Sequence, residues 1–421
     1  MGQDGGSAEV PSPRSLPSET VDALAPLSLS ARARALQPSL TLAIAARAKA
    51  LRAEGEDICS LSAGEPDFDT PPFIRQAAAE ALEAGHTRYG PVAGEPALRE
   101  AIARKQSLEN NVPTRVEQVL VTNGGKQALF NLFQVLLDPG HEVLLPVPYW
   151  LSYPEMVRLA GASLKLLPSS AATGFRLDPA QLEAAITPAS RLLVLNSPSN
   201  PTGVVLSREE LEAIAAVVRR HPQLAVVCDE IYEFLVAPGH RHHSFAAVAP
   251  DLADRTFLVN GFAKGWAMTG WRVGWLAGPR EVVAAASALQ SQSTSNVCSF
   301  AQLGALAAIS GSRDCVRAMA ARFDARRRLL SDGLATIADL SLVEPEGAFY
   351  AFPDVSAWGL DSMTLSQRLL EEVGLAVVPG IAFGDDRCIR LSCAASEATI
   401  SDGLERLSRF GAQLKAVAVQ P

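Results

Sequence analysis

The sequence predicts an α/β fold: a mostly parallel sheet with helices on both faces, and beside it a smaller α+β domain. Three observations carry this prediction. Between residues 119 and 290, five short apolar runs alternate with longer stretches of helical periodicity, as in sheets that are buried on both faces. Each of these runs is followed at once by a polar or aromatic cluster. Beyond residue 310 the alternation gives way to a long helix and several short strands, which indicates a second domain.

The length and composition of the chain favour two globular domains. Its 421 residues, of which 48% are apolar, can bury a large core. The net charge is −8 and the Lys and Arg residues are scattered, which argues against a surface for nucleic acid or for an anionic membrane. No run approaches the ~18 continuous apolar residues of a membrane span. Any acidic ligand must therefore be held by a few local cations.

Residues 1–28 predict a disordered tail. They are rich in Gly, Ser, Pro and Ala and lack an apolar signal core. The acids in this stretch outnumber its single basic residue, Arg14, which disfavours a transit peptide for an organelle. We therefore expect the protein in the cytoplasm.

The cysteines and histidines give little support to a metal site. Six cysteines are spread through the chain without a CxxC pair, so neither a disulfide framework nor a cysteine-based metal centre is indicated. Cys228 lies in an apolar run and is expected to be a buried thiol in a reducing compartment. The cluster 240–243 follows Pro238-Gly239 and is more typical of a solvated loop than of a set of ligands. We expect no metal.

The elements follow in order along the chain. A helix is expected over 39–52 with Ser39 as its cap, then a turn-rich stretch over 62–71, and then helices over 72–84 and 95–109. The apolar runs predict strands at 119–121, 143–145, 192–195, 224–227 and 257–259, with a further strand at 273–277. Helices are expected near 126–137, 150–159, 207–219 and 280–290.

The last hundred residues predict a helix near 313–335 and short strands near 341–343, 349–352, 376–378 and 389–391. Because the first helix and the turn-rich stretch precede the large domain, both ends of the chain are expected to build the small one. The predicted boundaries are a tail at 1–28, a small domain at 29–74 and 311–421, and a large domain at 75–310.

The stretch 261–275 contains only two charges, Lys264 and Arg272, in an otherwise small and apolar run. Lys264 is expected in a turn at the carboxyl end of a buried strand, where ligands of such sheets bind. A lysine in a dry pocket loses its proton easily and can form an imine with an aldehyde, which pyridoxal 5′-phosphate (PLP) supplies. The planar fork of Arg272 suits the phosphate of that cofactor. A surface lysine beside a structural arginine is the alternative.

Other strand ends carry groups that suit the same cofactor. Gly124-Gly125 opens a helix, whose free amides favour a phosphate. Asp229 can keep a pyridine nitrogen protonated, although a helix cap or a core acid would look the same in the sequence. Asn200 and Tyr232 can reach a phenolate oxygen. Trp150 or Tyr149 can stack on the face of the pyridine ring.

Arg390 lies in an apolar strand context, Cys388-Ile-Arg-Leu-Ser392. An unpaired guanidinium there would be costly, and a bound carboxylate would satisfy it with two hydrogen bonds. A buried ion pair with an acid of the protein is the alternative.

Together the motifs resemble the class I and II aminotransferases, which are fold-type I PLP enzymes. The resemblance runs from about Leu29 to the end. It rests on Asn196-x-Pro-x-Asn-Pro-x-Gly203, Asp229-x-x-Tyr232 and Lys264 followed by Arg272-x-Gly274. Three further runs resemble bacterial aspartate aminotransferases of the subgroup that includes prephenate aminotransferases: Ala63-Gly-Glu-Pro-Asp-Phe-Asp-Thr-Pro71, Gly124-Gly-Lys-Gln-Ala-Leu-Phe-Asn-Leu132 and Pro148-Tyr-Trp-x-Ser-Tyr-Pro-Glu-Met156.

The resemblance implies a role for each matching residue around the cofactor. Lys264 would bind PLP and shuttle the proton, and Asp229 would pair with the ring nitrogen. The phenolate oxygen would be held by Asn200 and Tyr232, and the ring face by Trp150. The phosphate ligands would be the amides of Gly124, Gly125 and Lys126, the side chain of Arg272, and Tyr89 from a second subunit, so a homodimer is expected.

The resemblance also implies the substrate contacts. Arg390, with Gly64 and Asn200, would bind the α-carboxylate, and Lys126 with Thr41 would bind the side-chain carboxylate of a dicarboxylic substrate, close to Trp150. A solvated helix position is the alternative for Lys126. Gln37 stands where relatives that use prephenate carry a basic residue, which weakens prephenate relative to aspartate. Gly261 and Ala263 replace serines that are common near the lysine in the wider family.

The function expected from the resemblance is transamination of aspartate with 2-oxoglutarate by a ping-pong mechanism. Alternatives on the same fold use prephenate, alanine or aromatic amino acids, or catalyse a PLP-dependent β-elimination as a β-lyase. A non-catalytic binding or regulatory protein is a third reading. The presence of all four of Lys264, Asp229, Arg272 and Arg390 argues against it. The partners expected are small amino and 2-oxo acids, with no nucleic acid and no membrane.

Overall fold

The computed structural model describes residues 27–36 and 40–418, and these fall into two units. The first unit ends at Leu36 and contains the short helix α1 (Ala31–Ala35), whose amide at Ala33 donates to the Ser30 hydroxyl. The second unit holds all other elements. The predicted tail, the Ser39 cap and Gln37 lie mostly or wholly outside the described residues.

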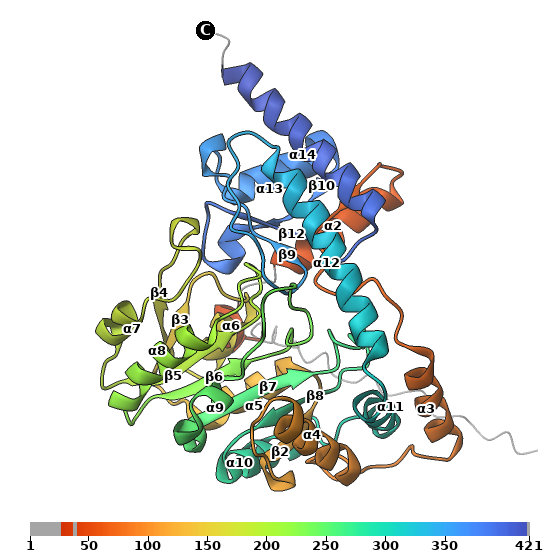
Figure 1. Ribbon diagram of the computed structural model, residues 1–421, viewed down its shortest axis with the longest axis vertical. Coiled ribbons are helices and arrows are strands. Elements are labelled where there is room, and N and C mark those ends of the chain that lie inside the picture. Colours follow the sequence, from red (N-terminus) through yellow and green to blue (C-terminus); the bar gives the residue numbers. More distant parts are fainter. Residues whose placement is uncertain (1–26, 37–39, 419–421) are drawn as a thin grey trace, which may run out of the picture. The chain divides into compact units, whose positions relative to one another are not determined.

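A seven-stranded sheet forms the centre of the second unit (Figure 1). Its strands lie in the order β2-β8-β7-β6-β5-β3-β4. Within this sheet, β8 is the one strand that runs antiparallel to its neighbours. The mostly parallel sheet predicted from the apolar runs is therefore confirmed. The strand bounds are β2 (Val119–Thr122), β3 (Glu142–Pro146), β4 (Ser163–Leu167), β5 (Ser190–Asn196), β6 (Ala225–Asp229), β7 (Thr256–Gly261) and β8 (Gly274–Ala277).

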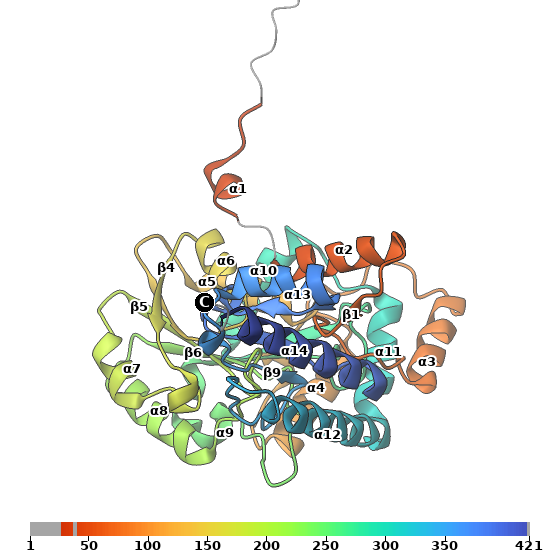
Figure 2. The ribbon, with the colours of Figure 1, turned by 90° about the horizontal axis from the view of Figure 1, so that it is seen from above.

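Helices cover both faces of the sheet because alternate strand residues point to opposite sides. Leu193, Val226 and Leu258 pack in one hydrophobic cluster with α4 (Pro96–Glu109), α8 (Arg208–Arg220), α9 (Phe245–Val248) and α11 (Ser299–Ser310). Their neighbours Val194 and Val227 face the other way, onto a cluster with α5 (Gly125–Leu136), α6 (Ser152–Leu159) and α10 (Arg280–Ser291). In Figures 1 and 2, α3 (Pro72–Glu83) lies against α11.

A third hydrophobic cluster belongs to a smaller region built from both ends of the chain. Its short strands are β1 (Cys59–Ser60), β9 (Tyr350–Ala351), β10 (Leu375–Ala376), β11 (Val378–Pro379) and β12 (Ile389–Ser392). β1 pairs in parallel with β10, so residue 59 lies beside residue 375. The helices of this region are α2 (Leu40–Ala53), α12 (Asp314–Ala335), α13 (Ser362–Val373) and α14 (Glu397–Ala418), seen together in Figure 2. As expected, segments that precede and follow the large sheet in the sequence build this region together.

Several elements were not predicted, among them α11, β4 and α7, and one predicted strand is nearly absent. The helix α11 was missed because it is apolar on all sides, being packed between α3 and α4. The edge strand β4 is largely exposed and carries Lys165, so it lacks a continuous apolar run. A short helix, α7 (Pro179–Ala185), begins at the cap Asp178. Of the strand expected at 341–343, a single bridge from Ser341 to Asp354 is found. No helix among the described residues is long and apolar enough to cross a membrane.

Candidate active site

A cavity of about 660 Å³ opens where the carboxyl ends of the parallel strands face the smaller region. It lies at the place predicted for ligands of such a sheet. The residues predicted for the site that line it are Gly64, Gly124, Gly125, Lys126, Trp150, Asn200, Asp229, Tyr232, Lys264, Arg272 and Arg390. Strand ends far apart in the sequence thus converge on one space.

Lys264 lies in the turn after β7, with its amine in the cavity. Its Nζ donates to the carbonyl oxygen of Gly64. The pKa of Lys264 is lowered to about 8, chiefly by burial; the carboxylate of Glu65 opposes this shift, and the positive charges of Arg390 and Arg272 contribute to it. The neutral, nucleophilic form of this amine is therefore far more populated near physiological pH than in an ordinary lysine.

Asp229 ends β6 and is buried, with its carboxylate held in one orientation. The hydroxyl of Tyr153 donates to Oδ2 at 2.8 Å, and the amide of Ile231 donates to Oδ1 at 3.2 Å. Burial raises the pKa of Asp229 to about 6, although these two hydrogen bonds lower it. Asp229 precedes no helix and lines the cavity, with Tyr153 and Ile231 fixing the orientation of its carboxylate.

Gly124, Gly125 and Arg272 together form a site that suits an anion, which we call the cradle. Gly124 caps α5 and Gly125 is its first residue. Gly124 has φ 79°, and a side chain there would lie 2.6 Å from Nη2 of Arg272. The guanidinium is itself fixed by Nη1, which donates to the carbonyl of Thr269 at 2.7 Å. The amide of Gly124 donates to the carbonyl of Thr122 at 2.7 Å, so the anion would be held by the amino terminus of α5 that begins at Gly125 and by the guanidinium of Arg272.

Gly274 makes this cradle possible by its lack of a side chain. A Cβ at Gly274 would lie 2.6 Å from the carbonyl carbon of Gly124 and from the nitrogen of Gly125. The backbone of β8 can therefore approach the start of α5 closely enough to hold Arg272 beside the glycine pair.

Arg390, on β12, is buried and has no acidic partner among the described residues. Nη1 donates to Oδ1 of Asn200 and Nη2 to the carbonyl of Ser62, each at 3.0 Å, while Nε has no partner. Its guanidinium carbon lies 4.4 Å from the ring centre of Tyr350. The alternative of an ion pair with a protein carboxylate is therefore not found, and the guanidinium keeps capacity for an anionic ligand.

Tyr232 and Tyr350 form a buried pair, with their hydroxyl oxygens 2.9 Å apart. Burial raises the pKa of Tyr232 well above its ordinary value, so its hydroxyl stays protonated and can donate. Both rings line the cavity, and Tyr350 also packs on Arg390.

Lys126 follows the cradle residue Gly125 directly, in the first turn of α5. Its Nζ lies 4.9 Å from the ring centre of Trp150, and it forms no ion pair with any described carboxylate. Burial lowers the pKa of Lys126, and the charge of Arg272 adds to the effect. Lys126 is exposed in the single chain, as a solvated helix position would be, and an amine that borders the cavity without an acid also suits an anionic group of a ligand.

Two predicted residues are not found in the cavity. Tyr89 is 92% exposed and does not line it. The side chain of Thr41 lies outside the part that the structure describes. The exposure of Tyr89 in a single chain does not test its prediction, because that prediction places Tyr89 in the site of a second subunit.

Sequence reasoning missed Tyr153, Tyr350 and Glu65. Tyr153 follows Trp150 by three positions, so the start of a helix would put both on one face, and that spacing was the available signal. Tyr350 stands in the aromatic run 349–352, which looks like core packing. Glu65 was quoted within a motif, but its contact with the Thr269 hydroxyl at 2.7 Å, beside Lys264, has no signal in the sequence.

Comparison with known proteins gives a consistent picture. The family model described as aminotransferase class I and II matches residues 56–407. The aspartate/prephenate aminotransferase of Thermus thermophilus is 46% identical over 384 residues, which cover 90% of this chain and 98% of that protein. A bifunctional aspartate aminotransferase and glutamate/aspartate-prephenate aminotransferase of Petunia hybrida is 46% identical over 396 residues. These cover 91% of this chain and 82% of that protein.

Two solved structures share the fold over nearly their whole length. The aspartate aminotransferase from Thermus thermophilus with maleate has a TM-score of 0.87 at 46% identity, with 91% of this chain and 99% of that chain covered. The aspartate aminotransferase from Rhizobium meliloti has a TM-score of 0.89 at 39% identity, with 92% of this chain and 99% of that chain covered.

Proposed function

Because the chain belongs to the class I and II aminotransferases, we propose that it transfers the amino group of aspartate to 2-oxoglutarate, with PLP as its cofactor. The observation that supports a dicarboxylic substrate is a pair of cations, Arg390 and Lys126, that have no acidic partner among the described residues and lie in the same cavity as Lys264. Two such cations suit two carboxylates. Relatives named for aspartate and a similar structure that holds maleate, a dicarboxylate, support the same class.

The residues of the cavity fit PLP. The cradle would be filled by a side chain at Gly124, and the amino terminus of α5 and Arg272 suit a phosphate. Asp229 would hold the pyridine nitrogen, Asn200 and Tyr232 the phenolate oxygen, and Trp150 the ring face. When bound, PLP supplies an aldehyde that captures amino groups and a protonated ring that withdraws electrons from the substrate α-carbon.

Lys264 has the chemistry of both a nucleophile and a proton carrier. With its pKa lowered to about 8, Nζ can hold a proton or release it near neutral pH, which is the condition for efficient general acid–base catalysis. Its contact with the Gly64 carbonyl keeps the amine at the substrate side of the cavity. Lys264 would therefore take the proton from the α-carbon and return it on the cofactor side.

Arg390 and Lys126 orient the substrate. Arg390 is fixed by Asn200 and Ser62, so a carboxylate placed against its free edge has one preferred position. A second carboxylate would reach Lys126. Fixing both ends aligns the α-carbon with Lys264 and excludes water, and positioning of this kind lowers the reaction barrier.

A second candidate donor-acceptor system includes prephenate. The observation that favours it is the size of the cavity and the presence of Lys49 and Arg52 in its lining, on α2. These cations extend the positive surface beyond Lys126, which leaves room for a dianion larger than aspartate. We also propose a homodimer, in which exposed Tyr89 reaches the cradle of the partner.

The test is a panel of amino donors, including aspartate, alanine and phenylalanine, against 2-oxoglutarate, oxaloacetate and prephenate. We expect the highest kcat/KM with aspartate and 2-oxoglutarate and none in Lys264→Ala. Lys126→Ala should lower kcat/KM for aspartate more than tenfold, which corresponds to over ~1.4 kcal/mol, and leave alanine unchanged. Lys49→Ala is the matched control, with an unchanged aspartate value.

Three outcomes would contradict the proposal. Turnover by Lys264→Ala at the wild-type rate would exclude the lysine mechanism. A loss below tenfold in Lys126→Ala would exclude Lys126 as the dicarboxylate anchor. Preference for an apolar donor would exclude the substrate class.

A further inference from the structure

Two tyrosines meet where the large sheet faces the smaller region, and their hydroxyl groups contact each other. Tyr232 follows β6 and Tyr350 lies on β9, and their hydroxyl oxygens are 2.9 Å apart. Both rings are buried and line the cavity. Among the described residues, neither hydroxyl has a second hydrogen-bond partner. The pair uses one of its two hydroxyl hydrogens in this contact, so the other is free for a ligand.

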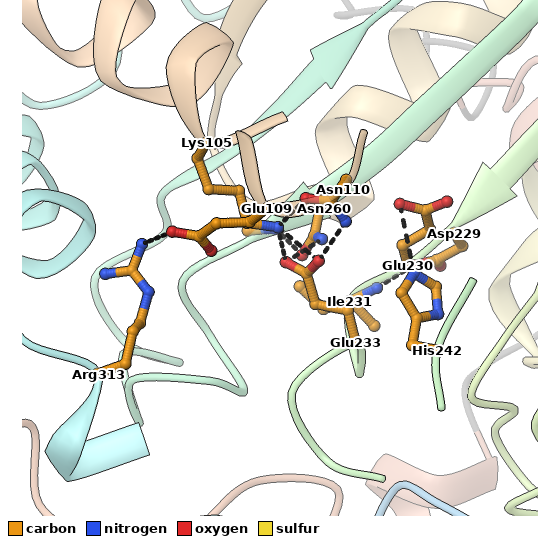
Figure 3. A network of polar contacts seen from close by, with 11 residues as sticks. Lys105, Glu109, Asn110, Asp229, Glu230, Ile231, Glu233, His242, Asn260 and Arg313 are labelled. Carbon is orange, nitrogen blue, oxygen red and sulfur yellow. Dashed lines mark hydrogen bonds and ion pairs between the residues drawn. The ribbon is translucent and has the colours of Figure 1, made fainter. Parts of the chain in front are cut away.

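The position of Tyr232 is fixed by the residue that follows it, Glu233. The buried carboxylate of Glu233 binds three side chains: Lys105 of α4, Asn110 at 2.8 Å and Asn260 of β7 at 2.9 Å. Figure 3 shows these three side chains gathered around Glu233. A buried polar network with all its members satisfied is rigid. The backbone beside Tyr232 is therefore held in place, and the part of Tyr232 that can still turn is its hydroxyl hydrogen.

Tyr350 is placed by Arg390, which lies between two aromatic rings. The guanidinium carbon of Arg390 is 4.4 Å from the ring centre of Tyr350 and 5.0 Å from that of Phe383, so the cation packs on the ring of Tyr350. Burial raises the pKa of Tyr350, and the charge of Arg390 opposes this rise. The Tyr350 hydroxyl therefore keeps its proton near neutral pH and can donate it in a hydrogen bond.

We propose that Tyr350 is a positioning residue that donates a hydrogen bond to Tyr232 and thereby directs the Tyr232 hydrogen onto the phenolate oxygen of PLP. This inference rests on the proposed function, in which Tyr232 donates to that oxygen. A tyrosine hydroxyl has a single hydrogen, so Tyr232 can donate to the cofactor only while its contact with Tyr350 is one in which it accepts. Loss of the Tyr350 hydroxyl would leave the buried Tyr232 oxygen without a donor, which is costly.

Two other roles for Tyr350 make different predictions. As a packed wall of the cavity it would act through its ring, and as a direct contact of the ligand it would act without Tyr232. A double-mutant cycle separates these roles from the proposed one. If Tyr350 acts through Tyr232, removal of its hydroxyl has no further effect once the Tyr232 hydroxyl is absent.

The first measurement is the dissociation constant of PLP, by absorbance at pH 7.5. We expect Tyr350→Phe to bind PLP about three- to tenfold more weakly than wild type, because one hydrogen bond is lost. In the Tyr232→Phe background the same substitution should change the affinity by less than about twofold. Tyr149→Phe is the matched control: Tyr149 does not line the cavity, so the affinity of this variant should match wild type.

The second measurement is the affinity of the PLP-loaded protein for succinate, a dicarboxylate without an amino group, by calorimetry. Tyr350→Phe keeps a ring against Arg390 and should bind succinate within about twofold of wild type. Tyr350→Leu removes the ring as well and should weaken succinate binding about threefold or more. Urea unfolding of each variant checks that both affinities are measured on folded protein.

The inference fails in three cases. If Tyr350→Phe binds PLP as tightly as wild type, the Tyr350 hydroxyl does not orient Tyr232. If the loss of PLP affinity is equally large with and without the Tyr232 hydroxyl, Tyr350 acts through packing or on the ligand itself. If Tyr350→Phe weakens succinate as much as PLP, its effect is not confined to the cofactor. In each case wild type still binds PLP, whereas a wild-type protein that takes up no PLP overturns the proposed function as well.

Discussion

At the scale of single residues, Asp229 is kept in an environment that opposes its own charge. Burial raises its pKa from 3.8 to about 6 even though Tyr153 and Ile231 donate to it. A group whose pKa is higher in the folded state stabilises the fold below its unfolded pKa and loses that contribution as the pH rises through the folded pKa. In the cofactor-free protein, ionised Asp229 therefore costs stability at neutral pH.

Asp229→Asn should consequently stabilise the cofactor-free protein at pH 7.5, by about 2–3 kcal/mol for a pKa difference of this size. The gain should shrink as the pH falls through 6 and disappear below 4, where Asp229 is protonated in both states. Urea denaturation across this range measures it. The same variant should bind PLP more weakly, since the ring nitrogen loses its partner.

Asp251→Asn is a control for which the expected change in stability at neutral pH has the opposite sign. Asp251 is exposed and pairs with Arg219 at 2.7 Å, which lowers its pKa. Its contribution is present above the unfolded pKa and is lost in acid, so this variant should be destabilised at neutral pH if it changes at all. An Asp229→Asn protein that is less stable than wild type at pH 7.5 would contradict the account.

At the scale of elements, the contact between β8 and the start of α5 controls the cradle. A methyl group at Gly274 would overlap the backbone of Gly124 and Gly125 and would approach the carbonyl of Asn260 to 2.9 Å. Backbone atoms cannot move aside as flexible side chains do, so β8 or α5 must shift. Arg272 lies two residues away and would shift with the strand.

Gly274→Ala should therefore weaken PLP binding at least tenfold and lower the free energy of unfolding by ~1–3 kcal/mol, the usual cost of overpacking. Absorbance titration and urea denaturation measure the two effects. Gly270→Ala is the matched control, because a Cβ there meets nothing within 4 Å. Equal PLP affinity of Gly274→Ala and wild type would show that the close approach is not needed.

The elements that the sequence predicts well are those with a strong local pattern. Continuous apolar runs identified β2, β3, β5, β6 and β7, because the middle of a strand that is buried on both faces is apolar, and its polar residues lie at the ends. Helices such as α8 begin at a recognisable cap, here Ser207 with Glu210. By contrast, α11 is packed between α3 and α4 and has no polar face, and the apolar run of the largely exposed strand β4 is interrupted by Lys165.

The candidate site shows the same limit. Lys264, Asp229, Arg272 and Arg390 were predicted because each places a charge in an apolar or small-residue context. The contacts that tune them were not, since Tyr153 reaches Asp229 across 76 positions and Tyr350 reaches Tyr232 across 118. Such pairs depend on how strands and helices meet in space, and a single sequence carries no record of that.

At the scale of the whole molecule, the proposed dimer can be tested through Tyr89. In one chain Tyr89 is exposed and lies outside the cavity, so we expect it to act in the site of the other subunit. A mixed dimer of Lys264→Ala and Tyr89→Ala chains would then contain one site with Lys264 from one chain and an intact Tyr89 from its partner.

When the Lys264→Ala and Tyr89→Ala proteins are mixed under conditions that let subunits exchange, the activity should therefore rise above the mean of the two separate samples. Steady-state rates before and after mixing measure this. The control mixes Lys264→Ala with a chain that carries both substitutions, which contains no complete site in any pairing and should show no gain. If the first mixture also shows no gain while exchange is complete, Tyr89 is not shared between subunits.

The pairing of β1 with β10, and the position of Arg390 on β12, have a consequence for synthesis of the chain on the ribosome. Lys264, Asp229 and the cradle are synthesised by the time the large sheet is complete, but the strand that pairs with β1, and then Arg390, follow about one hundred residues later. Chains are made at ~5–20 residues per second, so the nascent chain spends several seconds with a finished sheet and an open cavity. We infer that the cofactor cradle is accessible in the nascent chain, and that Arg390, which would bind the substrate carboxylate, is added last.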